Sequence, residues 1–163
     1  MPKPPHELVE LLYRYDPAIQ SLALGLRQVV VDEMAPCHEY IFNMRSKVVL
    51  LYGATDHVIK DCICQIHVFQ RHVLLVFPRG VDLPDRRGIL QGTGKAARHL
   101  TLRRLSELDR PEIRGCIRRA RKHAGLKRPR QRAAGDVVTR VKKTSALGGA
   151  SIVVERSARW RSL

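Results

Sequence analysis

The sequence has 163 residues, which is enough for one domain with a single hydrophobic core. It carries 30 basic and 15 acidic residues, and no apolar run approaches the roughly 20 residues that a membrane-spanning helix needs. The first ten residues, MPKPPHELVE, lack the basic and apolar regions of a signal peptide, so we expect a cytoplasmic protein. The four cysteines form no CxxC pair, and we expect reduced thiols.

Two helices are predicted before the first strand. Leu8, Leu11 and Leu12 have helical spacing. Residues 17–34 then present an apolar face, with Asp16 expected as the cap and Pro17 at the first helical position. Pro36 is expected to end this helix.

Five short segments then have the composition of β-strands: EYIFNM (39–44), KVVLLY (47–52), ICQIHVF (63–69), HVLLVF (72–77) and RHLTLRRL (98–105). The short QRH connection between the third and the fourth predicts a hairpin. Residues 106–125 form the last predicted helix, which Gly125 ends. Its predicted inward-facing residues are Ile113, Cys116, Ile117 and Ala120. Helices at both ends of a five-stranded antiparallel sheet predict an α+β fold with the helices packed on the sheet.

The predicted domain spans residues 6–125, and residues 126–163 form a basic tail. DVVTRVKK and ASIVVERS have strand character around an LGGA turn, yet the surrounding arginines and lysines favour a segment without fixed structure. We therefore expect the tail to be mobile or to form a loosely attached hairpin.

The tail is the most basic part of the chain. Residues 127–163 carry 10 basic and 2 acidic residues, whereas residues 1–126 carry 20 and 13. This density favours contact with a polyanion, but a single aromatic residue, Trp160, provides no stacking platform for single strands. One hypothesis is that the tail binds nucleic acid without sequence specificity. The alternative is that its charge only keeps the protein soluble. The candidate nucleic-acid contacts are Lys127, Arg128, Arg130, Arg132, Arg140, Lys142 and Lys143.

The stretch LQGTGKAARHL, residues 90–100, contains the letters of a phosphate-binding loop. A Walker loop needs a glycine at position 89 and a hydroxyl at position 96, where this chain has Ile89 and Ala96. Gly92, Gly94 and Ala97 match a dinucleotide fingerprint, but a strand is predicted to follow where that motif requires a helix. We favour a structural glycine turn.

The functional alternative is a pocket for a small anion at this turn. The amides of Gly92 and Gly94 would converge there with Lys95 and Arg98. The full set of candidate ligand-binding residues is Gly80, Asp82, Asp85, Gly92, Gly94, Lys95, Arg98 and His99. In the competing interpretation Arg98 pairs with Asp82 or Asp85, and no site is vacant. An acid–base pair of these aspartates with His99, or a turn cap by Asp85, are further alternatives.

The stretch HVLLVFPRGVDLPDRRGILQGTGKAARHLTL resembles the signature of the YdhG-like family, the domain-of-unknown-function 1801 proteins. In that family a strand of the form HVxLxF and a glycine precede LPDPDGLLxGxGK and RHI. Upstream segments are also similar to that family: YDPAIQSLALGLRQVV, CHEYIF, and YGATD before the strand CICQIHVF. The resemblance therefore covers about residues 14–123. It implies the helix–sheet–helix architecture and little about activity. The sequence departs from the family at two places. Asp85-Arg86-Arg87-Gly88 stands where the family has Asp-Pro-Asp-Gly, and Arg45-Ser46 stands where relatives tend to have Tyr-Asn after the first strand.

Some relatives in that family carry an iron-chaperone label by analogy with frataxin, which implies clustered carboxylates. Here the acidic residues of the first helices are scattered, and a net charge of +15 repels ferrous iron. Cys62 and Cys64 alternate on one strand and are expected on one face as core thiols. No nucleophile elbow or HExxH motif is present. We therefore favour a non-catalytic binding module for a small anion or metabolite, with no metal or cofactor.

Overall fold

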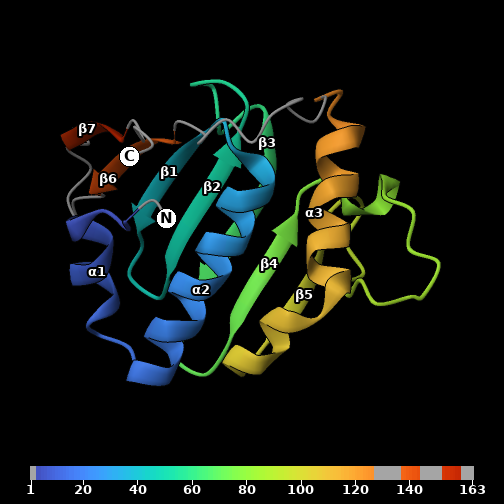
Figure 1. Cartoon of the computed structure of the whole chain (residues 1–163), viewed down its shortest axis with the longest axis horizontal. Coiled ribbons are helices and arrows are strands. Elements are labelled where there is room, and N and C mark those ends of the chain that lie inside the picture. The colour runs from blue at the N-terminus through green and yellow to red at the C-terminus, as the bar shows by residue number, and fades with distance from the viewer. Residues whose placement is uncertain (1–2, 127–136, 144–151, 159–163) are drawn as a thin grey trace, which may run out of the picture.

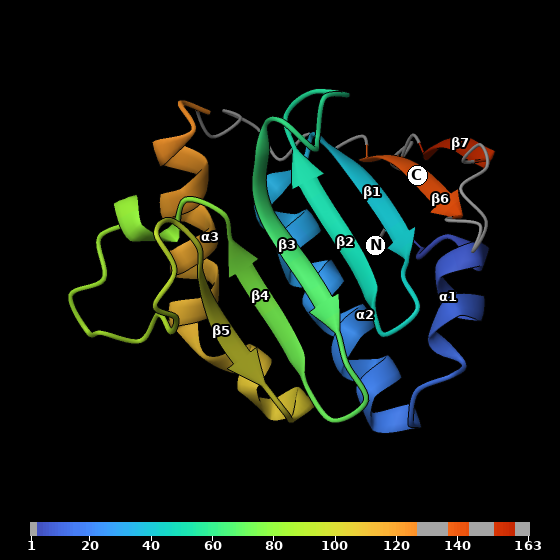
Figure 2. The same ribbon diagram turned by 180° about the vertical axis from the view of Figure 1, so that it is seen from behind.

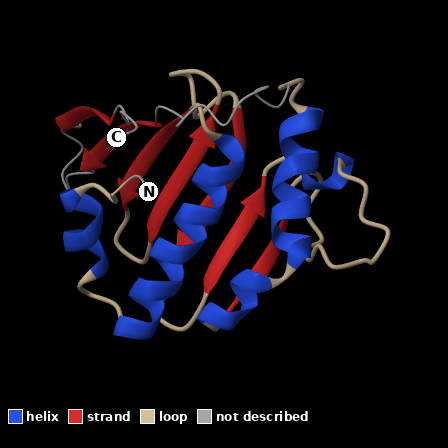
Figure 3. Cartoon of the chain, in the orientation of Figure 1, coloured by secondary structure: helices blue, strands red, loops and turns tan. Residues whose placement is uncertain are grey.

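The computed structural model describes residues 3–126, 137–143 and 152–158. Within them, helices α1 (His6–Leu12), α2 (Pro17–Met34) and α3 (Pro111–His123) pack on one face of a single β-sheet (Figure 1). The view from behind shows the other face of the sheet, which carries no described helix (Figure 2). This separation of helices and strands into two layers confirms the predicted α+β fold (Figure 3).

The five predicted strands are β1 (Cys37–Asn43), β2 (Val48–Gly53), β3 (Cys62–Val68), β4 (Val73–Phe77) and β5 (Arg98–Leu102). Each is antiparallel to the next, so the predicted antiparallel arrangement of the five strands is confirmed. β3 and β4 form the predicted hairpin, which is closed by a bond from the N–H of Phe69 to the carbonyl of His72.

α2 has the predicted bounds, with Asp16 at the N-cap position and Pro17 in the first turn, although the Asp16 side chain makes no capping hydrogen bond. α3 begins later than predicted. Pro111 occupies its first position, where a missing N–H costs nothing, and the preceding residues form the 3₁₀ turn η2 (Leu105–Asp109). The buried residues of α3 are those predicted: Ile113, Cys116, Ile117 and Ala120.

Two further strands extend the sheet beyond β1. β6 (Val137–Lys143) pairs in parallel with β1, and β7 (Ile152–Ala158) pairs antiparallel with β6. The strand order is therefore β5-β4-β3-β2-β1-β6-β7. The two predicted tail segments pair with each other and join the sheet through β1, so the sheet does not end with residue 125; the predicted LGGA turn lies outside the described residues. Local strand character could not reveal this, because parallel pairing joins segments that are distant in the chain.

A carboxylate lies in the core between α2 and the sheet. Glu39 of β1 is fully buried and accepts bonds of 2.8 and 2.9 Å from the guanidinium of Arg27 on α2. The hydroxyls of Tyr52 on β2 and Thr139 on β6 donate to the same carboxylate at 2.6 and 2.7 Å. Burial and the charge of Glu39 raise the pKa of Tyr52, so its phenol keeps the proton that it donates. These four residues, the buried carboxylate cluster, tie α2 to three strands.

None of the helices in the described part of the chain combines the length and the apolar character that a membrane crossing requires.

Candidate functional site

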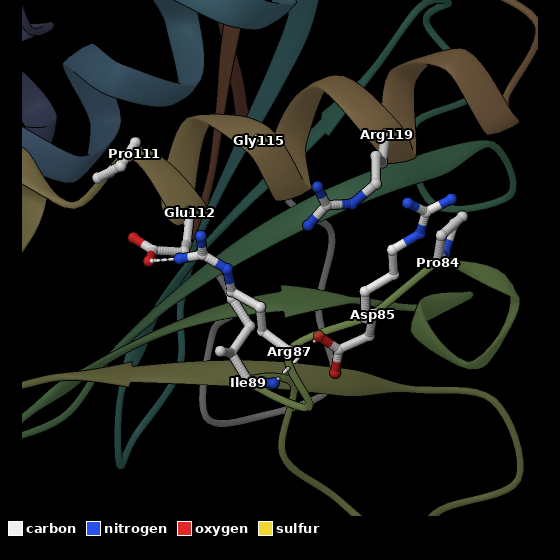
Figure 4. Close-up of a pocket in the computed structure, with 9 residues that line it drawn as sticks. Pro84, Asp85, Arg87, Ile89, Pro111, Glu112, Gly115 and Arg119 are labelled. Atoms are coloured by element: carbon white, nitrogen blue, oxygen red, sulfur yellow. Dashed lines mark hydrogen bonds and ion pairs between the residues drawn. The ribbon is translucent and has the colours of Figure 1, made fainter.

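A cleft of about 520 Å³ lies between α3 and the loop that follows β4. This volume falls within the range of about 300–1,000 Å³ that is usual for small-molecule sites. The residues that line the cleft are Pro84, Asp85, Arg86, Arg87, Ile89, Pro111, Glu112, Gly115 and Arg119. Figure 4 shows Glu112 and Arg119 extending from the helix, and Arg87 extending from the loop toward Glu112.

Asp85 shapes the loop side of this cleft. Its two carboxylate oxygens accept bonds from the backbone N–H groups of Ile89 at 3.0 Å and Leu90 at 2.9 Å. Gly88 has a φ of 63°, and its N–H bonds to the carbonyl of Asp85 at 3.1 Å. The expected alternative in which Asp85 caps a turn is therefore confirmed.

The helix side of the cleft is formed by Glu112 and Arg119. Glu112 accepts a bond of 2.9 Å from Arg87, and its own backbone N–H together with Arg87 holds the pKa of this carboxyl below its usual value. Arg119 donates from Nη2 to the sulfur of Cys116 at 3.1 Å, while its Nε is buried without a hydrogen-bond partner. Burial raises the pKa of Cys116, which keeps this sulfur a neutral thiol.

The cleft lining is cationic. It contains three guanidinium groups and two carboxylates. Asp85 is committed to the loop backbone, and Glu112 neutralises Arg87. Among the described residues, no carboxylate forms an ion pair with Arg86 or Arg119. Three guanidinium groups against two carboxylates leave the lining with a net charge of +1, and Arg86 and Arg119 are the two cations not held in an ion pair with a described residue.

The glycine loop does not gather its cations at one point. Arg98 donates from Nη1 to the carbonyl oxygens of Gly94 and Ala97, both at 2.7 Å. Gly92 has a φ of 121°, which favours glycine, and Lys95 is exposed. The preferred interpretation as a structural turn is confirmed, whereas anion binding at Lys95 stays a prediction.

The competing interpretation, in which Arg98 pairs with Asp82 or Asp85, is wrong, because Arg98 bonds to backbone carbonyls instead. Asp82 instead bonds to Arg79 at 2.6 Å and lies 3.7 Å from His123. Asp85 is occupied by the backbone of its own turn. In the described part of the chain, no hydrogen bond or ion pair joins either aspartate to His99, so the acid–base arrangement has no support.

Gly80 is required for packing, and Gly94 is not. A Cβ at Gly80 would lie 2.8 Å from the backbone nitrogen of Arg98, whereas a Cβ at Gly94 would meet nothing within 4 Å. We expect Gly80→Ala to lower the free energy of unfolding by about 1–3 kcal/mol, and Gly94→Ala to leave it nearly unchanged. Urea unfolding of both variants measures this difference. Equal stability of the two would contradict the close contact between Gly80 and β5.

Cys62 and Cys64 do not share a face, contrary to the prediction. The register of β2 and β3 shifts between Tyr52 and Gly53. Cys64 consequently lies in the main core, while Cys62 packs against a smaller apolar cluster on the other side of the sheet. Burial raises the pKa of both thiols. The described residues contain no group of three His, Cys, Asp or Glu side chains that could hold a metal ion.

The tail candidates are only partly within the described residues. Those outside are Lys127, Arg128, Arg130 and Arg132. Arg140 lies on β6, where its guanidinium stands 5.6 Å from the ring of Tyr40 and donates to its hydroxyl at 2.7 Å. Lys142 and Lys143 occupy the end of β6. Nucleic-acid binding by the tail stays a prediction.

Of the residues that line the cleft, only Asp85 was a predicted ligand-binding residue, and Arg119 is among those that the sequence analysis missed. A signal for it is Gly115, because a glycine inside a helix usually has a packing or functional reason. A Cβ at that position would lie 3.4 Å from Nη1 of Arg119. The glycine therefore leaves room for the guanidinium to lie along the helix and enter the cleft.

No protein-family model matches this chain, and comparison with curated proteins and with solved structures found no similar protein.

Proposed function

We propose that the chain is a non-catalytic binding module for a small anion or anionic metabolite, and that the anion enters the cleft beside α3. The observation that carries this proposal is the position of Arg119. Among the described residues its hydrogen-bond partner is a neutral thiol, and no carboxylate forms an ion pair with it. A guanidinium in this state can donate to an oxyanion, and such charge-assisted bonds to phosphate or carboxylate are among the stronger hydrogen bonds.

We also infer membership of the YdhG-like family, on the strength of the sequence resemblance and the matching order of helices and strands. Arg86 and Arg87 stand where that family has proline and aspartate, and both line the cleft. The anion preference that we propose is therefore a property of this chain. The same cationic lining favours an anion over the ferrous ion of an iron chaperone.

The test is the melting temperature of the full chain with phosphate, nucleotides and small di- and tricarboxylates. An anion at about 100 times its Kd adds about 2.7 kcal/mol, which raises the melting temperature by several degrees. We expect Arg119→Gln to abolish that increase. Lys60→Gln is the charge-matched control, because Lys60 is exposed in the loop between β2 and β3 and does not line the cleft.

Two results would overturn the proposed site. If Arg119→Gln responds to the anion as the native chain does, the anion binds elsewhere. Loss of the response in Lys95→Ala alone would place it at the glycine loop. If no anion shifts the melting temperature of the native chain, the binding function itself is wrong.

A further inference from the structure

The face of the sheet away from the helices has a distinct composition. We call it the open face. Because side chains alternate along a strand, the strand residues that do not face the helices lie on it. One row across five strands consists of Phe42, Val49, His67, Leu74 and Thr101. The next row consists of Tyr40, Leu51, Gln65, Val76 and His99. Glu39 is the only acid of β1–β6, and it points to the helix side.

At one end of the open face, cations and aromatic rings alternate across the strands. The ammonium of Lys47 stands 5.4 Å from the centre of the Phe69 ring. Phe69 and His72 are stacked, with ring centres 4.9 Å apart and planes inclined by 19°. Burial and the charge of Arg103 lower the pKa of His72. We name Lys47, Phe69, His72 and Arg103 the basic aromatic row.

The basic aromatic row is accessible. Lys47, Phe69 and His72 are partly exposed, and Arg103 is exposed. The β1–β2 and β3–β4 turns meet at this end of the sheet (Figure 2). These turns add the exposed guanidinium groups of Arg45 and Arg71.

The neighbouring histidine adds no charge to the row. His67 lies beside Lys47, with 3.1 Å between Nδ1 and Nζ. Burial and Lys47 lower the pKa of His67 to about 4, so the imidazole is neutral at physiological pH. Its Nδ1 can then accept a hydrogen bond from the Lys47 ammonium and hold that group over the Phe69 ring.

We propose that the open face binds single-stranded nucleic acid, with bases stacked on the Phe69–His72 pair and phosphates held by Lys47 and Arg103. Aromatic rings on a sheet offer every base a stacking surface, and flanking cations follow the phosphate backbone. A duplex keeps its bases stacked inside and cannot use this pair. A second copy of the chain is a poorer occupant, because two chains of charge +15 repel each other.

The experiment measures the binding of a fluorescein-labelled oligouridine of about 12 nucleotides, and of a duplex of equal length, by fluorescence anisotropy of the full chain. We expect the native chain to prefer the single strand. Phe69→Leu keeps an apolar side chain and removes the ring, and it should weaken single-strand binding by about five- to twenty-fold without affecting the duplex. Tyr13→Leu is the control, since Tyr13 is an aromatic residue, 69% exposed, at the end of α1.

Charge is tested separately at the same site. Lys47→Gln should reduce the slope of log affinity against log salt by about 0.7, the value for one phosphate contact with a single strand. If Phe69→Leu does not fold, His72→Leu replaces it in the comparison. Equal binding of single strand and duplex, unchanged by Phe69→Leu, would assign all binding to the charged tail and overturn the proposal. A dimer that Phe69→Leu dissociates and Tyr13→Leu does not would also overturn it.

Discussion

Replacing Glu39 with glutamine is expected to lower the free energy of unfolding by about 3–5 kcal/mol, because Arg27 would keep its charge in the core without a counter-ion. The side chains of Arg27 and Glu39 are 4% and 0% exposed, so water cannot replace the lost partner. Tyr52 and Thr139 would each lose a charged acceptor as well. Guanidinium chloride unfolding, followed by circular dichroism, measures the change.

Two further variants make this result specific to the buried pair. Glu10→Gln removes the acid of an exposed pair with His6 and should change stability by less than about 1 kcal/mol. The double replacement Arg27→Met and Glu39→Leu removes both charges and should cost less than Glu39→Gln alone. A Glu39→Gln protein as stable as the native chain would mean that the carboxylate and guanidinium are not buried together.

Ending the chain after Gly125 is expected to lower the free energy of unfolding by at least about 3 kcal/mol or to prevent folding. Val137 and Val141 of β6 are 1% and 4% exposed, and burial of one such side chain contributes about 1.5–3 kcal/mol. The truncation also removes the Thr139 hydroxyl from Glu39 and exposes the edge of β1. Urea unfolding and the fraction of protein in the soluble, monomeric state report the effect.

Point substitutions in β6 separate packing from simple shortening of the chain. Val141→Ala, at a buried position, should cost more than Val138→Ala, at a partly exposed position on the same strand. Full stability of the truncated chain would contradict the pairing of β6 with β1. Tail charge is therefore better tested by glutamine substitutions of Lys127, Arg128, Arg130 and Arg132 in the full chain, which leave β6 in place.

Most individual elements could be predicted from the sequence by itself. The helical period of residues 17–34, with a proline at the start and another just past the end, sets both bounds of α2. The β-branched composition of the strands and the short β3–β4 connection set the antiparallel order of β1–β5. The same local signals show that the glycine loop is a turn. These features depend on residues that are close together in the chain, where period, turn chemistry and propensity act directly.

The remaining features were decided only by the tertiary structure. The parallel pairing of β6 with β1 and the bond from Thr139 to Glu39 join residues 100 positions apart. The register shift that separates Cys62 from Cys64 depends on the pairing of two strands. Arg119 meets the loop of residues 84–89 only because α3 packs beside it. Local patterns do not specify such contacts, since each arises from the packing of surfaces that the chain brings together when it folds.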